Sequence, residues 1–181
     1  MLNYNEFTNS SKLEEKSNTY NFGCSMVYFN CPELQKIQAQ INPDDLYTED
    51  NDRYGIEDEH HVTLLYGLHS EEIEEADVMR ISAGQIPPIR LANASAFESK
   101  DYDVLKFDAD CPTLHEINKA LCELPHTTDF PDYHPHATVA YFKKGKAADY
   151  IKQLEDISFE VTPSKIVYSK PDGSKTTQEL N

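Results

Sequence analysis

Two segments of this chain share one pattern, and that pattern constrains the fold more than any other feature. Each segment begins with histidine, any residue and threonine, then continues as an apolar run that reaches a tyrosine: HVTLLY from His61 and HATVAY from His136. Short apolar runs are typical of buried strands, on which residues two apart project from the same face. Each segment therefore presents an imidazole beside a hydroxyl, and the repetition predicts a duplicated structure.

A third histidine-x-threonine triplet begins at His126 but has a different setting. Pro125 precedes it and the residues DFP follow it, which predicts a loop with no strand behind it. We therefore place the candidate chemistry on the first two triplets alone.

The rest of the chain predicts short strands and helices in the order β-α-β-α-β-β-α-β-α-β-β. The strands are expected at residues 22–29, 61–68, 89–99, 102–109, 136–142, 159–169 and 174–180. The helices are expected at residues 32–41, 70–82 with Ser70 as N-cap, 111–124 and 145–157. Residues 1–18 are polar and without periodicity, which favours an arm ahead of one two-lobed α+β domain over residues 19–181.

The charge restricts the partner. Thirty-two acidic residues oppose 16 basic ones, giving a formal net charge of −16. Long nucleic acids are held mainly by Lys and Arg contacts to phosphates, so a long nucleic acid is not an expected partner. A small ligand with two or three phosphates remains possible, because a local cluster of donors can hold it.

Other features place the chain in a broad class. No apolar run reaches the roughly 18 residues that a membrane span needs, and the polar start is unlike a signal peptide, so a cytoplasmic protein is expected. The cysteines show neither a CxxC pair nor zinc-ligand spacing, which favours reduced thiols.

The paired residue types suit cleavage of a phosphodiester bond. One group must take a proton from the attacking oxygen, another must give one to the leaving oxygen, and histidine does either near neutral pH. The two threonine hydroxyls would bind the non-bridging phosphate oxygens. This scheme requires no metal and no cofactor, and it leaves open which histidine is the base.

The segments HHVTLLYGL and YHPHATVAYF resemble the paired motifs of the 2H phosphoesterase superfamily, over about residues 20 to 180. The resemblance implies a two-lobed, pseudo-duplicated α+β (LigT-like) fold with antiparallel sheets lining a central cleft. It also implies that the catalytic residues are His61, Thr63, His136 and Thr138.

Within that superfamily, the small size, the acidity and the segment GIEDEHHVTLLYGL are most similar to the phage anti-CBASS nucleases. This narrower resemblance implies cleavage of the 3′-5′ linkages of cyclic di- and trinucleotides in the host cytoplasm, with a ribose 2′-OH as nucleophile. The effect would be to silence an immune signal of the host.

Several alternatives stay open. The chain has no tryptophan, so bases would stack on Tyr66, Phe97, Tyr141 or Tyr168, each of which also suits the core. Lys143 would neutralise phosphate or simply end a strand in solvent. The protein could instead open the 2′,3′-cyclic phosphate of RNA termini, sequester a cyclic nucleotide without cutting it, or act as an acidic interaction protein. The oligomeric state is not predicted.

Overall fold

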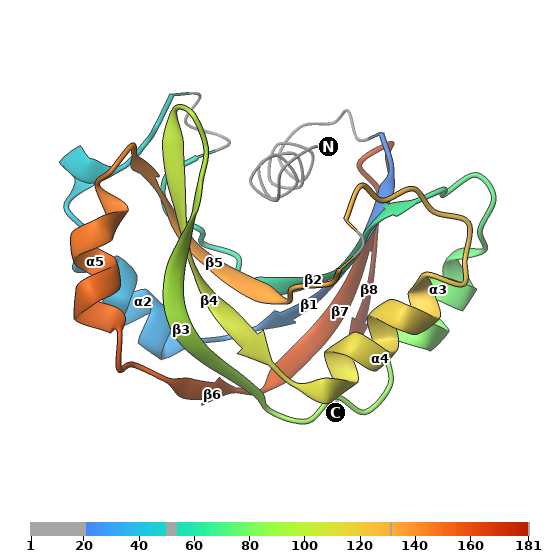
Figure 1. Cartoon of the computed structure of the whole chain (residues 1–181). Helices are drawn as coiled ribbons and strands as arrows, with labels where there is room; N and C mark the ends of the chain where they lie inside the picture. The colour runs from blue at the N-terminus through green and yellow to red at the C-terminus, as the bar shows by residue number, and fades with distance from the viewer. Residues whose placement is uncertain (1–20, 50–53, 131, 181) are drawn as a thin grey trace.

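The strands of the protein form two antiparallel sheets that meet along their edges. The structure, a computed structural model, describes residues 21–49, 54–130 and 132–180. The first sheet has the order β2 (His61–Leu68), β1 (Gly23–Phe29), β7 (Pro163–Ser169), β8 (Lys175–Glu179). The second has the order β5 (His136–Lys143), β4 (Tyr102–Asp110), β3 (Ile89–Glu98), β6 (Phe159–Val161). The edge strands β2 and β5 lie side by side, so the two sheets form one cradle (Figure 1).

Helices cover the outer face of this cradle (Figure 1). The first sheet is packed by α3 (Glu75–Ser82) and α4 (Pro112–Leu121), and the second by α2 (Pro32–Gln38) and α5 (Ala147–Leu154). Helix α2 follows a strand of the first sheet yet packs against the second, whereas α4 does the reverse. The two halves of the chain are therefore interlocked. Every helix in the described ranges is too short or too polar to cross a lipid bilayer.

The two halves repeat a local sequence signal as well as a topology. A strand of each half ends at a Cys-Pro pair, Cys31-Pro32 in the first half and Cys111-Pro112 in the second. Each cysteine is the N-cap of the following helix and each proline takes its first turn, where the missing N–H costs nothing. The next strand in each half is the motif strand, so the duplication predicted from the sequence is present in the backbone.

Burial along the motif strands explains why the motif side chains face the inside of the cradle. Val62 and Leu64 on β2, and Ala137 and Val139 on β5, are completely buried in one core shared by both sheets and the helices. Burying a valine or leucine side chain stabilises the fold by about 1.5–3 kcal/mol. Because neighbouring residues on a strand face opposite sides, this burial fixes the histidines and threonines on the opposite face.

We call this opposite face the motif face of each sheet. The α+β class and the two-lobed arrangement expected from the sequence are confirmed. The predicted arm at residues 1–18 lies outside the described residues.

One helix boundary was predicted wrongly. The helix expected from Ser70 begins only at Glu75, after a turn, and Ser70 is not its N-cap. The hydroxyl of Ser70 instead forms a hydrogen bond of 2.7 Å with the hydroxyl of Tyr168 on β7. Ser70 therefore bonds to Tyr168, which is distant in the sequence, instead of capping the helix.

One strand was also predicted wrongly, because residues 159–169 form two strands in different sheets. Strand β6 pairs with β3, whereas β7 begins at Pro163 and pairs with β1. Proline cannot donate to a strand ladder and often marks such an interruption. The hairpin of β7 and β8 around Gly173 agrees with the prediction.

Candidate active site

The two motifs meet where the edge strands of the two sheets run next to each other. His61 is the first residue of β2 and His136 is the first residue of β5. They are close enough that the charge of His61 contributes to lowering the pKa of His136. Residues that are far apart in the sequence are thus brought within electrostatic reach of each other.

His61 is held in one orientation by two contacts. Its Nδ1 donates a hydrogen bond of 2.7 Å to the backbone carbonyl of Glu59. Its ring stacks on Tyr28, with centroids 5.1 Å apart and an angle of 29° between the planes. Because a carbonyl oxygen only accepts, the neutral imidazole carries its proton on Nδ1 and its lone pair on Nε2.

His136 repeats this arrangement on the second sheet. Its Nδ1 donates a hydrogen bond of 2.9 Å to the carbonyl of His134, and its ring meets Phe97 edge to face at 4.9 Å. Burial lowers the pKa of His136 to about 4, helped by the positive charges of Lys106 and His61. The hydrogen bond to His134 and the carboxylate of Asp108 act in the opposite direction without cancelling the effect. His136 is therefore neutral at pH 7.

The two threonines stand beside these histidines with their hydroxyls available. Thr63 and Thr138 are half-buried on the motif face, two residues after each histidine. In the part of the chain that the structure describes, neither hydroxyl has a hydrogen-bond partner. Hydroxyl donors that are not already engaged can bind a phosphoryl oxygen without first breaking another contact.

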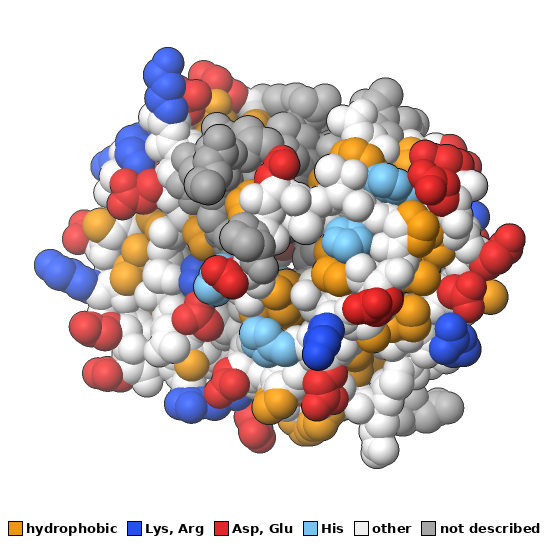
Figure 2. Space-filling view, turned by 45° about the vertical axis from the view of Figure 1, so that its right-hand side comes forward, with side chains coloured by type: hydrophobic (Ala, Val, Ile, Leu, Met, Phe, Trp, Pro, Cys, Tyr) orange, Lys and Arg blue, Asp and Glu red, His pale blue; other side chains and the backbone are white. Residues whose placement is uncertain are grey.

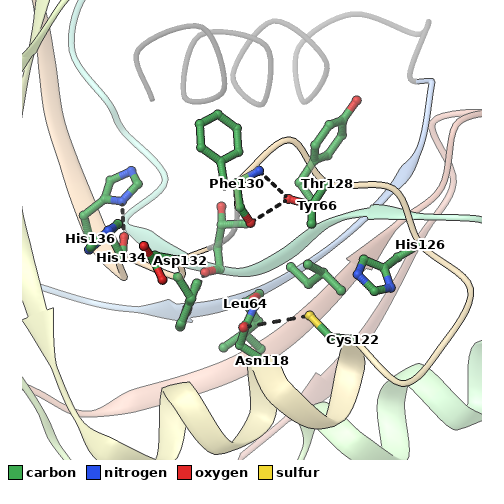
Figure 3. Close-up of a pocket in the computed structure, with 13 residues that line it drawn as sticks. Leu64, Tyr66, Asn118, Cys122, His126, Thr128, Phe130, Asp132, His134 and His136 are labelled. Carbon is green, nitrogen blue, oxygen red and sulfur yellow. Dashed lines mark hydrogen bonds between the residues drawn. The ribbon is translucent and has the colours of Figure 1, made fainter. Parts of the chain in front are cut away.

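A cavity of about 240 Å³ opens next to the motifs. Figure 3 shows His134, His136 and Asp132 on one side of it, Leu64 and Asn118 on another, and His126 at a third. Its lining residues are Thr63, Leu64, Leu65, Tyr66, Asn118, Cys122, His126, Thr128, Phe130, Asp132, Tyr133, His134 and His136. Thr63 and His136 thus line the cavity, whereas His61 and Thr138 lie outside this lining.

The residues predicted to bind substrate fall into two groups. Tyr66 lines the cavity and Phe97 contacts His136. Tyr141 and Tyr168 are each 1% exposed, so their ring faces are covered by the core. Lys143 is exposed at the far end of β5, where its Nζ donates a hydrogen bond of 2.7 Å to the carbonyl of Asp44. Only Tyr66 and Phe97 are therefore placed near the motifs.

Sequence reasoning missed several residues of the site. The loop triplet from His126 to Thr128, which we set aside, lines the cavity with both of its end residues. Asn118 on α4 donates a hydrogen bond of 2.7 Å to the carbonyl of Leu64, which ties the helix to the motif strand. Lys106 stands beside His136, and the only signal for it was a lysine inside an otherwise apolar strand segment.

The surface of the molecule carries acidic and histidine side chains. Figure 2 shows acidic side chains scattered over the surface, with histidine side chains exposed among apolar and uncharged atoms. In residues 21–49, 54–130 and 132–180 there is no group of three or more His, Cys, Asp or Glu side chains placed to hold a metal ion.

The family profile described as "Anti-CBASS protein Acb1" matches residues 35–167 of the chain. The chain belongs to this family. The match spans both motif strands, and it confirms the anti-CBASS resemblance found in the sequence. No curated protein sequence matches the chain.

Solved structures of similar fold include Usb1 of Kluyveromyces marxianus. Its complex with uridine monophosphate has 14% identity and a TM-score of 0.57, and the match covers 92% of this chain and 99% of that one. A second Usb1 structure has 13% identity and a TM-score of 0.54, covering 91% and 100%. LigT of E. coli in apo form has 12% identity and a TM-score of 0.44, covering 90% and 96%. The Usb1 likeness confirms the two-lobed α+β fold expected from the sequence.

Proposed function

We propose that this anti-CBASS family member is a phosphodiesterase that cleaves the 3′-5′ linkages of cyclic di- and trinucleotide signals. His61 and His136 transfer the protons, and Thr63 and Thr138 bind the non-bridging oxygens of the scissile phosphate. The protein would act in the cytoplasm of an infected host, where it removes the messenger of a defence system. Its substrate is a small nucleotide rather than a polymer, in line with the net charge of −16.

One observation carries this proposal: two histidines from different sheets sit at the start of adjacent edge strands, each fixed through Nδ1 by a backbone carbonyl. This hydrogen bond turns Nε2 of each ring to the opposite side. Two imidazoles fixed in this way supply the pair of proton transfers that a phosphodiester cleavage needs, and each transfer is typically worth about 10²–10⁴-fold in rate.

The protonation state favours His136 as the base. A pKa near 4 keeps His136 neutral at pH 7, which is the state that a general base needs, whereas a histidine that acts as the acid must be protonated. His136 would take the proton of the ribose 2′-OH while O2′ forms a bond to phosphorus and the P–O5′ bond breaks. His61 would give its proton to O5′. The products are a 2′,3′-cyclic phosphate and a 5′-hydroxyl, and water then opens the cyclic phosphate with the two roles reversed.

Aromatic side chains near the motifs would hold the bases. Phe97 lies beside His136 and Tyr66 lines the cavity, which supports the proposal that they stack on bases next to the scissile phosphate. Stacking contributes about 1–3 kcal/mol per base and needs no net positive charge on the protein. An acidic protein can therefore bind an anionic cyclic nucleotide.

The test is to incubate the purified protein with 3′,3′-cyclic GMP-AMP in excess EDTA and to follow the products by chromatography and ³¹P NMR. We expect a linear product with a 2′,3′-cyclic phosphate end before full hydrolysis. The matched control is the doubly 2′-deoxy analogue, which lacks the nucleophile and should persist. An unchanged 3′,3′-cyclic GMP-AMP peak with folded protein would count against the proposal.

The same assay separates the alternatives left open by the sequence. Cleavage of an RNA end bearing a 2′,3′-cyclic phosphate, without cleavage of the cyclic dinucleotide, would assign the protein to RNA-end processing. Tight binding followed by release of intact ligand on denaturation would make it a sequestering protein instead.

A further inference from the structure

Lys106 is an unusual residue for the middle of a sheet. It lies on β4 and is only 7% exposed, although lysine is among the residues least often buried. Its neighbours Leu105 and Phe107 are completely buried in the core, so Lys106 projects from the other side of β4, the motif face. Removing an ammonium group from water is costly, and such a group is retained mainly where it has a partner or a task.

The strand register places Lys106 directly beside the second motif. Lys106 is paired with Thr138 on β5 and with Ser95 on β3, which puts the three side chains in one row across the motif face. His136 lies one row further along the same face, opposite Asp108. Lys106 is therefore a cross-strand neighbour of Thr138 and a diagonal neighbour of His136, two residues that the proposed reaction uses.

The contacts of Lys106 leave donor capacity for a ligand. Nζ forms an ion pair with Asp108 and lies over the ring of Phe97, 5.1 Å from its centroid. An ammonium group has three N–H bonds, and in the described part of the chain Asp108 is the one acceptor recorded for it. The carboxylate of Asp108 is 47% exposed, so it stays hydrated if the ammonium turns to another anion.

The first sheet offers an instructive contrast. There Lys165 lies over the ring of Tyr28, 5.2 Å from its centroid, but on β7. Because β1 separates β7 from β2, Lys165 is two strands away from His61, about 9–10 Å at the usual strand spacing. Lys106 is on the strand next to that of His136 and one row away from it, a diagonal of about 7–8 Å. In this comparison, the lysine of the second sheet lies closer to His136 than the lysine of the first sheet lies to His61.

We infer that Lys106 is a further catalytic residue, whose ammonium group contacts a non-bridging oxygen of the scissile phosphate in the same row as Thr138. This inference rests on the function proposed above and adds a residue to the same site. As negative charge builds up on the phosphoryl oxygens, a fixed cation in a partly desolvated place stabilises the transition state more than the ground state. Lys106 also disfavours protonation of His136, which faces Asp108 on β4 and His61 on β2 as well.

The experiment compares the wild-type protein with Lys106→Met and Lys106→Arg. Methionine keeps the length of the side chain and removes its charge. The matched control is Lys152→Met on α5, an exposed lysine on the outer face of the same sheet. For each protein, kcat and KM are measured with 3′,3′-cyclic GMP-AMP, and binding of inorganic phosphate is measured through the imidazole resonances of His61 and His136. Thermal unfolding verifies folding, and Lys106→Gln replaces Lys106→Met if the methionine variant does not fold.

We expect Lys106→Met to lower kcat about 100-fold or more, the usual effect of losing one transition-state donor, with a smaller change in KM. Its phosphate affinity should fall about tenfold, Lys106→Arg should recover part of both losses, and Lys152→Met should stay within twofold of wild type. A folded Lys106→Met with kcat and phosphate affinity within twofold of wild type would overturn the inference. If wild type cleaves no cyclic dinucleotide, the proposed function fails, and the phosphate measurements alone still decide the role of Lys106.

Discussion

The hydroxyl of Tyr133 donates a hydrogen bond of 2.8 Å to the backbone carbonyl of Thr63. Tyr133 lies in the loop just ahead of His136, so this bond joins the approach to the second motif to the strand of the first. Tyr133 and Thr63 both line the cavity. The two halves of the site are therefore linked by a contact within the site, in addition to the shared core.

Replacing Tyr133 by phenylalanine should lower activity more than stability. The loss of one hydrogen bond costs about 0.5–1.5 kcal/mol of folding free energy, while the loop that leads into His136 loses this bond to β2. We expect kcat for 3′,3′-cyclic GMP-AMP to fall several-fold. The control is Tyr150→Phe on the outside of the second sheet, which removes the hydrogen bond of 2.9 Å donated to Asp45 and the one of 3.1 Å accepted from the amide of Asn42. Equal rates for the two variants would show that the Tyr133 bond does not position the site.

Gly67 on β2 is where the cavity loop approaches the backbone most closely. It has φ of 116°, and a Cβ atom there would collide with the carbonyl oxygen of Thr127. The carbonyl of Gly67 also accepts a hydrogen bond of 2.9 Å from the amide of Thr127. Gly67→Ala should therefore destabilise the protein by more than about 1 kcal/mol, because both the backbone conformation and the contact are lost.

Urea unfolding measures this cost, with Gly84→Ala as the control. A Cβ atom at Gly84 would meet nothing within 4 Å. If Gly67→Ala unfolded at the same urea concentration as Gly84→Ala, the close approach of the loop to β2 would be contradicted.

The lowered pKa of His136 predicts a pH dependence of stability. Its pKa is about 4 in the folded protein, against 6.5 for the ordinary group, so the unfolded chain binds a proton that the folded chain resists. The contribution of His136 to the free energy of unfolding is fully present above about pH 6.5, and it is lost as the pH falls to about 4. Its upper limit is about 3 kcal/mol, from 1.36 kcal/mol for each pKa unit.

Comparing wild type with His136→Gln isolates this effect, since other groups titrate equally in both proteins. Relative to the variant, the wild-type free energy of unfolding should decline between pH 7 and pH 4. A direct NMR titration should find the imidazole of His136 neutral down to about pH 5. Protonation of His136 with a midpoint near 6.5 would remove the basis for assigning it as the base.

The threonine hydroxyls should matter for the reaction and little for folding. Thr63→Val and Thr138→Val keep the shape of the side chain and remove a hydroxyl that has no partner in the described part of the chain. Each should lower kcat by about 10²-fold, with the unfolding temperature nearly unchanged. A valine variant with wild-type kcat would take that threonine out of the phosphate-binding role.

Local sequence was sufficient for the strands that carry the motifs. The first residues of HVTLLYGL and HATVAYF alternate between core and motif face, with Val62 and Val139 in the core, and the rest of each strand is buried as its apolar run indicates. The errors arose where a distant partner decided the outcome. Ser70 bonds to Tyr168 rather than capping a helix, and the chain changes sheets at Pro163 to meet two different strands.

Of the candidate site, the sequence pointed only to the four motif residues, of which Thr63 and His136 line the cavity; their catalytic roles stay a prediction. The loop from His126 to Thr128 has no strand pattern, and it reaches the cavity because its backbone pairs with Gly67. Lys106 joins Thr138 through a register that contains a bulge between Leu105 and Lys106. Local spacing does not encode such a register, so these residues had to come from the structure.

The central claim is that two imidazoles from opposite lobes act on one phosphodiester bond. Single-turnover cleavage of 3′,3′-cyclic GMP-AMP by His61→Gln and by His136→Gln, each at saturating protein with binding measured in parallel, tests it most directly. We predict that each variant still binds the nucleotide and cleaves it about 10²–10⁴-fold more slowly than wild type. A cleavage rate within threefold of wild type for either folded variant would contradict the account.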